Sequence, residues 1–326
     1  MSKTLRTLGI LSVLLLLGAF AFAAGSEEVG GDDDVVTIGY AVFNVGVDSY
    51  ETYHNENFQA ECERLGAELI QLDAQGDITR QIDQVENLMQ RNPDVLVIWP
   101  VNGEAIVPVV KKAHDAGFPI VIANSPIDES GFDYITAYAG PDNTQEGRDA
   151  ATMMIEEFER RGVTGEKRVV ELMGLPGYVT AIQRSDGFQE VIAGRDDFTL
   201  LATEPTDWNR EKATRAMEDL LVRFDDLQGV YVADDNLGIG ALNALKEAGR
   251  AGEVVMTSAC IFGEGYDAME DGYLHGTCYQ YSGLDAINTV QVAVKVANGE
   301  DVPFMSSFES PMVTPENMDE FKRPEY

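Results

Sequence analysis

The residues best suited to chemistry are amides, carboxylates and aromatic rings that follow short apolar segments of the chain. In an open α/β sheet such segments are strands, and ligands bind just beyond their carboxyl ends. Carboxylate and amide oxygens accept hydrogen bonds from hydroxyl groups, and flat rings cover apolar C–H faces. The candidate ligand-binding residues are Phe43, Asn44, Asp48, Tyr50, Asn124, Tyr178, Arg184, Trp208, Asp234, Cys260 and Gln280. This set predicts a site for a small, neutral, hydroxyl-rich molecule rather than a phosphorylated one, which would need a basic clamp or a glycine-rich nest.

Several of these residues also have a structural interpretation. Asp234 and Asn124 precede expected helices and could be N-caps. Trp208 could be a core aromatic residue, and Arg184 suits a structural ion pair at least as well as a ligand contact. We expect Asp234 to lie at an exposed loop mouth, so that replacing it would weaken binding and leave the fold intact. Trp99 also follows an expected strand.

The sequence contains no recognisable catalytic or cofactor motif. It lacks a GxGxxG turn after a strand, a GxxxxGK[ST] loop, a GxSxG elbow, an HExxH helix and a CxxC pair. We expect each of the histidines to lie on the surface or to cap a helix; they are His54, His114 and His275. Cys62 is expected in the core, and the sequence allows Cys260 and Cys278 either to pair in an oxidising compartment or to stay free. We therefore expect a binding protein with no cofactor and no metal, not an enzyme.

The elements that must position these residues alternate between strand and helix. Val95–Ile98 is continuously apolar, as in a parallel strand covered on both faces. A helix over Asp77–Arg91 would place Ile78, Val85 and Met89 on one face. The other expected strands are Val35–Val42, Glu68–Leu72, Ile120–Ala123, Arg168–Met173, Thr199–Thr203, Gly229–Ala233 and Val254–Ser258. The other expected helices are Tyr50–Leu65, Gly103–Ala116, Asn143–Arg161, Ala181–Ile192, Arg210–Phe224 and Leu237–Ala248.

The order of these elements repeats along the chain. Asp94–Asn124 and Gly229–Ala259 both give a strand, a polar loop, a helix with an Ala-Gly stop, and a second strand. The pattern predicts an α/β protein with two similar lobes, each built on a doubly wound parallel sheet. In the tail we expect a strand over Gly276–Gln280, a helix over Tyr281–Asn298, an extended stretch over Val302–Phe308 and a helix over Thr314–Phe321. These leftover elements suggest that the chain crosses back, so the expected lobes are residues 35–141 with 281–306, and residues 142–280 with 307–326.

Composition and the N-terminal residues limit the class of protein. The 326 residues include 56 acidic and 23 basic ones, a formal net charge of −33, which gives no electrostatic footprint for nucleic acid. A hydrophobic content of 44% is enough for a globular core. Lys3 and Arg6 precede a short apolar run that ends in Ala21-Phe22-Ala23, which is typical of a cleaved secretory signal peptide over residues 1–23. Residues 24–34 are rich in glycine and acid and are expected to form a flexible leader.

A set of motifs makes the chain similar to a known family. They are TIGYAV, LDAQGDITRQIDQVENL, DVLVIWP, GFPIVIAN, GPDNTQEGRDAA, AIQRSDGFQEVI, DDNLGIGALNAL and VTPEN. From about Val35 to about Phe321 the chain resembles the type I, ribose-binding-like periplasmic sugar-binding proteins of ABC importers. The resemblance implies two Rossmann-like lobes joined by a three-strand hinge that closes on a ligand. It also implies a monomer of the periplasm or extracytoplasmic space that delivers its ligand to ABC permease subunits.

The resemblance also transfers some site positions and shows departures. The family's polar and aromatic residues after the first strand fall near Asp48 and Tyr50, its stacking aromatic on Trp208, its loop amide on Asp234 and its hinge glutamine on Gln280. Many members have an acidic and a basic residue at the positions of Asn124 and Ser125 in this chain. The ribose binders have a ligand-binding arginine at the position of Ile182 and a ligand-binding aspartate at the position of Cys260. We therefore expect a ligand other than ribose, such as a deoxy-sugar, a polyol, a furanose derivative or a nucleoside.

Four alternatives use the same scaffold. A ligand-sensing protein that feeds a chemoreceptor or sensor kinase is compatible with every motif above. An autoinducer-2-type or nucleoside binder is a further alternative for the ligand. The effector domain of a LacI-type repressor is disfavoured because a signal peptide, and no helix-turn-helix, is expected at the N-terminus. A secreted enzyme is disfavoured because no catalytic constellation is present.

Overall fold

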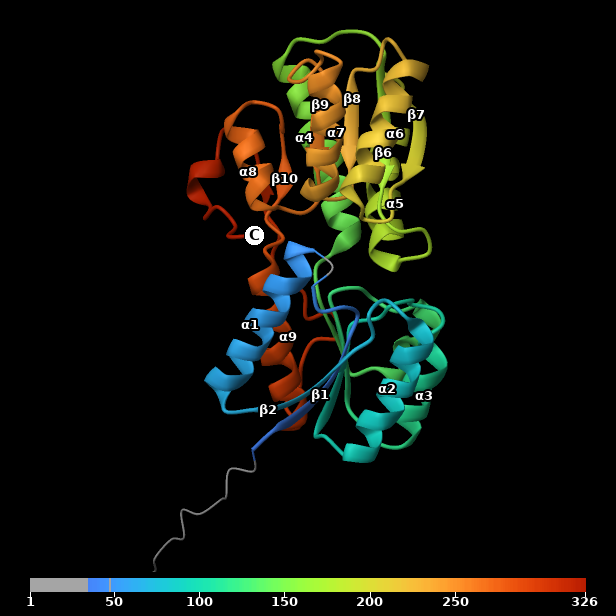
Figure 1. The fold of residues 1–326 in the computed structure, drawn as a ribbon, viewed down its shortest axis with the longest axis vertical. Helices are drawn as coiled ribbons and strands as arrows, with labels where there is room; N and C mark the ends of the chain where they lie inside the picture. The colour runs from blue at the N-terminus through green and yellow to red at the C-terminus, as the bar shows by residue number, and fades with distance from the viewer. Residues whose placement is uncertain (1–34, 47) are drawn as a thin grey trace, which may run out of the picture. The chain divides into compact units, whose positions relative to one another are not determined.

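The computed structural model describes residues 35–46 and 48–326, so the predicted signal peptide and leader lie outside the described residues. The described chain contains a five-stranded parallel sheet in the order β2-β1-β3-β4-β5 (Figure 1). Its strands are β1 (Thr37–Val42), β2 (Glu68–Asp73), β3 (Val95–Ile98), β4 (Ile120–Ala123) and β5 (Ala137–Ala139). Helices α1 (Ser49–Leu65) and α9 (Ser282–Ala297) pack together and cover one face. Helices α2 (Ile78–Arg91) and α3 (Val107–Asp115) pack against β1, β3 and β4 on the other face.

A second parallel sheet repeats the same plan with four strands in the order β7-β6-β8-β9. Its strands are β6 (Lys167–Met173), β7 (Phe198–Pro205), β8 (Gly229–Val232) and β9 (Val255–Ser258). Helices α4 (Asn143–Arg160) and α5 (Val179–Ala193) pack together, as do α6 (Arg210–Arg223) and α7 (Asp235–Glu247). Because β2-β1-β3-β4 and β7-β6-β8-β9 share one order, the predicted repeat and the predicted α/β fold class are confirmed.

The C-terminal part of the chain links the two sheets. Strand β10 (Thr277–Cys278) follows the second sheet, and α9 then packs against β3, β4 and β5 of the first. Strand β11 (Met312–Val313) pairs antiparallel with β10. Before it reaches β11, the chain forms an isolated parallel β-bridge between Met305 and Tyr138 of β5. The predicted crossing back is therefore present, whereas the lobe boundaries given above remain a prediction.

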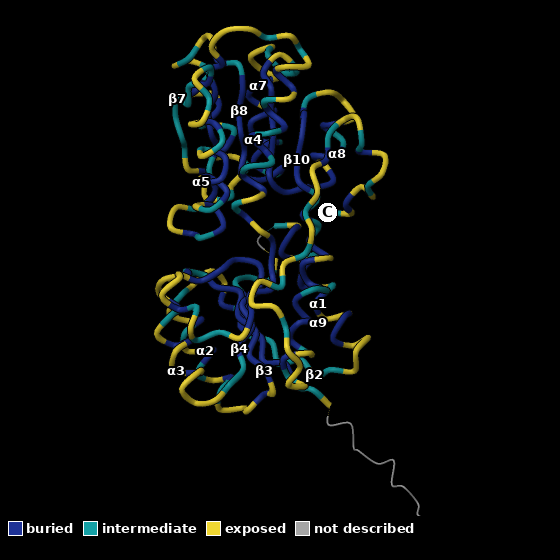
Figure 2. The backbone as a smooth tube through the Cα atoms, turned by 180° about the vertical axis from the view of Figure 1, so that it is seen from behind, coloured by how far each residue is buried: buried dark blue, intermediate teal, exposed yellow. Residues whose placement is uncertain are grey.

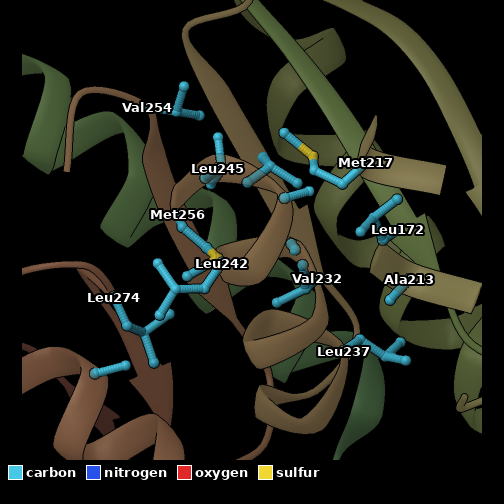
Figure 3. Close-up of a cluster of buried hydrophobic side chains, with 14 of the residues drawn as sticks. Leu172, Ala213, Met217, Val232, Leu237, Leu242, Leu245, Val254, Met256 and Leu274 are labelled. Atoms are coloured by element: carbon cyan, nitrogen blue, oxygen red, sulfur yellow. The ribbon is translucent and has the colours of Figure 1, made fainter. Parts of the chain in front are cut away.

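The buried cores explain why the strands are so apolar. Every residue of β3, β4, β8 and β9 is buried, and the buried stretches in Figure 2 run through the middle of each set of strands. Figure 3 shows the core of the second sheet, where Val232 of β8 and Leu172 of β6 lie near Met217 of α6 and Leu242 of α7. A strand covered on both faces favours apolar side chains, so β3 and β4 read as continuous apolar runs, although β9 also buries Thr257 and Ser258.

The structure corrects several expected elements. Helix α3 begins at Val107 rather than Gly103, because Asn102 accepts hydrogen bonds from the amides of Glu104 and Ala105 in a turn that precedes the helix. The helix expected over Thr314–Phe321 is only a 3₁₀ turn, η2 (Met318–Glu320), since a separate turn over residues 314–317 precedes it. The sequence analysis missed η1 (Glu129–Tyr134), α8 (Gly263–Glu270) and the three-residue strand β5. These elements are too short to give a clear hydrophobic period.

Two of the histidines differ from expectation, whereas the cysteines do not. His54 and His275 are buried, so the prediction of surface or capping histidines is wrong for both. Cys62 is buried in the core of the first sheet, as expected. Cys260 and Cys278 are buried and free rather than paired. Among residues 35–46 and 48–326, no helix is both long enough and apolar enough to cross a membrane.

Candidate ligand-binding cleft

A cavity of about 300 Å³ lies at the carboxyl ends of strands from both sheets. Every ligand-binding residue predicted from the sequence lines this cavity: Phe43, Asn44, Asp48, Tyr50, Asn124, Tyr178, Arg184, Trp208, Asp234, Cys260 and Gln280. The rule that ligands lie beyond the carboxyl ends of strands is what brings them together, because they follow β1, β4, β6, β7, β8, β9 and β10. That they contact a ligand remains a prediction.

Other residues outside the predicted set also line the cavity. They are Glu51, Gly76, Trp99, Leu175, Thr180, Asp207, Asn209 and Phe262. Trp99 was noted in the sequence as following a strand, and Leu175 and Phe262 lie after strands where the same positional rule could have found them. Glu51 and Thr180 lie inside the first turns of α1 and α5, where no sequence signal marks them. Ile182, the expected departure from the ribose binders, does not line the cavity and is exposed.

Aromatic rings form much of the wall. Phe43 stacks on Trp99 with ring centroids 6.1 Å apart, and Tyr178 meets Trp208 edge-on at 6.2 Å. Trp99 follows β3 of the first sheet, and its Nε1 donates a 2.7 Å hydrogen bond to the hydroxyl of Tyr178, which precedes α5 of the second sheet. The cavity is therefore bounded by rings from both sheets, and one hydrogen bond joins them.

The backbone is strained where Trp208 enters the wall. Asp207 and Trp208 have φ angles of 54° and 57°, in the left-handed region that bulky residues rarely adopt. Such a conformation costs on the order of 1–3 kcal/mol per residue and is concentrated at functional sites. The Trp208 ring packs directly over Gly174, where a Cβ would lie within 2.5 Å of ring atoms. Trp208 is thus partly buried against the core of the second sheet and also exposed to the cavity.

Two carboxylates reach the cavity from helix N-termini. Asp48 caps α1 by accepting from the amide of Glu51 at 3.0 Å, and Asp234 caps α7 by accepting from the amide of Leu237 at 2.7 Å. Burial raises the pKa of Asp48, and burial together with the charge of Asp48 raises the pKa of Asp234 to about 7. Asp234 is only 6% exposed, so the expectation of an exposed loop mouth is wrong. It acts as an N-cap, as the structural interpretation proposed, and also faces the cavity.

Arg184 combines the two interpretations that the sequence allowed. Its side chain is buried, and its Nε donates to Oε2 of Glu146 at 3.0 Å. Its Nη1 donates to the carbonyl of Ala233 at 2.9 Å, and its Nη2 donates to Oε1 of Gln280. Burial raises the pKa of Glu146 to about 7 although the guanidinium opposes the rise. The guanidinium is therefore engaged by protein groups even though it lines the cavity.

The wall formed by the first sheet contains a buried carboxylate that the sequence analysis missed. Asp285, in the first turn of α9, accepts from Nδ2 of Asn124 at 2.6 Å and from the hydroxyl of Tyr50 at 3.0 Å. Burial raises the pKa of Asp285 to about 7. His54 lies behind this wall with its ring 4.7 Å from that of Trp99, and burial lowers its pKa to about 3, so its imidazole is neutral at pH 7.

The chemistry of the cavity is that of a binding site. Within the described ranges 35–46 and 48–326, no group of three or more histidine, cysteine, aspartate or glutamate side chains could hold a metal ion. Cys260 is buried, its Sγ lies 3.6 Å from the carbonyl oxygen of Gln280, and burial raises the pKa of its thiol far above the usual range. The thiol is therefore protonated at neutral pH and is a poor nucleophile.

Comparison with known proteins places the chain in a family. Residues 38–301 match the model of the periplasmic binding protein domain. The chain belongs to the periplasmic binding protein family. It is 31% identical to the ribose import binding protein RbsB of Salmonella typhimurium over 75% of this chain and 79% of that protein. It is 26% identical to the xylitol-binding protein of Mycolicibacterium smegmatis over 96% of this chain and 86% of that protein.

A solved structure agrees in fold across nearly the whole chain. The ABC transporter solute-binding protein of Bacillus halodurans with bound myo-inositol superposes with a TM-score of 0.78 at 31% identity, covering 89% of this chain and 98% of that one. The resemblance drawn from the motifs is therefore confirmed, and this chain is a solute-binding protein of the ABC transporter type. The relatives are binding proteins, in agreement with the prediction that the chain is not an enzyme.

Proposed function

We propose that this protein captures a polyol or a neutral monosaccharide in the cavity between its two sheets and delivers it to an ABC importer. The observation that carries the proposal is the make-up of the cavity wall, which combines aromatic rings with amides and carboxylates, and in which the basic residue Arg184 is already bonded to protein groups. Asp48 and Asp234 can accept hydroxyl protons, and Trp99 and Trp208 can cover C–H faces.

The wall argues against an anionic ligand. Arg184 is the basic residue among those that line the cavity, and it is already paired with Glu146. A phosphate placed here would meet Arg184, which is already paired, and four lining carboxylates: Asp48, Glu51, Asp207 and Asp234. The names of the relatives point in the same direction, since they bind ribose, xylitol and myo-inositol. We place the ligand among polyols and cyclitols rather than ribose, because Asn124, Ser125 and Cys260 replace charged partners that ribose binders use.

Calorimetric titration tests this proposal. We expect the purified chain from residue 35 onward to bind at least one of xylitol, ribitol, myo-inositol and D-fucose, and not to bind ribose 5-phosphate. Ribose, a nucleoside such as adenosine and a furanose autoinducer serve as the alternative ligands. A chain that binds none of the polyols and neutral sugars, while its thermal unfolding shows that it is folded, would refute the proposal.

Export and delivery are separate parts of the proposal. The predicted signal peptide would send the protein across the membrane, and intact-mass analysis of native material should show a chain that begins near Ala24. Uptake of the bound solute by cells should then depend on the protein together with a permease. Uptake that is unchanged when the protein is deleted would favour the sensing alternative instead.

A further inference from the structure

A directed chain of hydrogen bonds runs beside the cavity from a guanidinium to a buried carboxyl group. It begins at Arg184, whose Nη2 donates to Oε1 of Gln280. Nε2 of Gln280 donates to the hydroxyl of Tyr50 at 2.8 Å, and that hydroxyl donates to Oδ2 of Asp285 at 3.0 Å. The residues in this hydrogen-bond chain come from α5, the segment after β10, α1 and α9, so the hydrogen bonds connect elements that pack on both sheets.

The two ends fix the direction of every bond between them. A guanidinium has only donors, and Oδ2 of Asp285 accepts from both Asn124 and Tyr50, so the bonds run in one direction from Arg184 to Asp285. Gln280 must therefore point its oxygen at Arg184 and its nitrogen at Tyr50. The proton of Tyr50 is committed to Asp285, which is 0% exposed and holds its position in the first turn of α9.

Asp285 also fixes the orientation of Asn124. Nδ2 of Asn124 donates to Oδ2 of Asp285 at 2.6 Å and to the hydroxyl of Tyr50 at 3.2 Å, so the amide nitrogen is held against these two groups. Its Oδ1 is then the polar atom that Asn124 can offer to the cavity that it lines. The Tyr50 hydroxyl, which donates once and accepts twice, has nothing left for a ligand, so Tyr50 presents only its ring.

We infer that Asp285 is a positioning residue that sets the specificity of the cavity through Asn124. By holding the amide nitrogen of Asn124 against Asp285 and Tyr50, it leaves Oδ1 as the atom that faces the cavity and makes this point of the wall an acceptor. A ligand must then supply a hydroxyl proton here. An analogue in which that hydroxyl is replaced by hydrogen leaves a buried acceptor unpaired and should bind roughly 10- to 100-fold more weakly. The inference rests on the proposed function, because it assigns this selectivity to the same cavity.

The test compares Asp285→Leu with the milder Asp285→Asn and with a control on the same helix. Leucine keeps the branching at Cγ but is larger and has no acceptor, so Asn124 is no longer held by a hydrogen bond to residue 285. Asparagine retains one oxygen acceptor and should restore part of the effect. Thr289→Val is the control, because Thr289 is buried one turn further along α9 and donates to the carbonyl of Ala139 at 3.2 Å, outside the chain described above.

The first readout needs no ligand. In a ¹H–¹⁵N spectrum, the side-chain amide pair of Asn124 is identified by its loss in Asn124→Ala. We expect Asp285→Leu to move that pair upfield, Asp285→Asn to move it less, and Thr289→Val to leave it in place. A pair that stays in place in Asp285→Leu would overturn the inference, whether or not a ligand is known.

The second readout is selectivity, with myo-inositol and its monodeoxy analogues as probes. In the wild type, at least one monodeoxy analogue should bind 10- to 100-fold more weakly than myo-inositol, and in Asp285→Leu that ratio should fall toward one. Thr289→Val should keep the ratio even if it lowers the unfolding temperature. A ratio that survives in folded Asp285→Leu refutes the role of Asp285, whereas a wild type that binds no polyol or sugar refutes the proposed function and leaves the spectrum to decide on Asp285.

Discussion

Replacement of Asp234 separates the two roles that the structure gives to one carboxylate. Asp234→Asn keeps an oxygen that can accept from the amide of Leu237, so the N-cap of α7 survives, but it turns the cavity-facing acceptor into a donor. A hydrogen bond to a charged group contributes about 1.5–3 kcal/mol, and about 1.4 kcal/mol is a tenfold change in affinity. We therefore expect Asp234→Asn to bind its polyol or sugar roughly 10- to 100-fold more weakly.

Asp234→Ala should weaken ligand binding to the same extent as Asp234→Asn and should also lower the stability of the folded chain. Loss of an N-cap costs about 1 kcal/mol, which lowers the unfolding temperature of a chain of this size by about 2 °C. The buried carboxylate itself resists ionisation, since its pKa is raised to about 7. Asp234→Asn removes that cost, so at pH 8 its unfolding temperature should equal or exceed that of the wild type.

Asp142 supplies the matched control for the cap. It caps α4 by accepting from the amide of Gln145 at 3.0 Å and does not line the cavity. Titration calorimetry and differential scanning calorimetry on both pairs of variants give the two quantities. We expect Asp142→Ala to lose stability without losing affinity. Wild-type affinity in Asp234→Asn would refute the assignment of Asp234 to the ligand, and equal destabilisation by Asn and Ala would refute the assignment to the cap.

Three further outcomes are expected. Gly174→Ala should push the Trp208 ring from the wall and weaken binding at least tenfold, seen as a changed tryptophan emission; unchanged binding would contradict the packing argument. Tyr178→Phe removes the hydroxyl that accepts from Trp99 and should weaken binding several-fold by loosening the contact between the two sheets, with no change meaning that this bond is not maintained in solution. Raised carboxyl pKa values of about 7 at Asp235 and other buried acids mean that the folded state holds more protons than the unfolded state, so the free energy of unfolding should decline as pH rises from about 4 to 7. Unfolding temperatures at pH 5 and pH 8 check this, and a rise with pH would contradict it.

The wall of the cavity was predictable because position along a parallel strand fixes position in space. Once β1, β4 and β8 are read from their apolar runs, the residues that follow them must meet at one edge of a sheet. The predicted set therefore needed no knowledge of which side chains touch. Among residues in the first turns of helices, Tyr50 was predicted as an aromatic residue that follows β1, whereas Glu51 and Thr180 were not.

Long amphipathic or apolar patterns in the sequence were enough to predict a helix or a strand, whereas short patterns were not. Helices such as α2 and α4 span several turns, and their amphipathic period is visible in the sequence. Helix α8 and strand β5 offer too few residues to distinguish a period. Their place depends on packing: α8 contacts α7, and β5 completes the edge of a sheet beside β4.

The sequence by itself determined the α/β repeat, the family and the kinds of groups that meet in the cavity. The tertiary structure decided which of those groups are free to bind. Arg184 and Asp285 lie 101 positions apart in the sequence. Their roles follow from hydrogen bonds through Gln280 and Tyr50, which no local sequence pattern encodes. Likewise the burial of His54 depends on Trp99, which a distant strand brings against it. Local sequence sets element type through periodicity, but hydrogen-bond direction and pKa depend on neighbours that only the packed fold supplies.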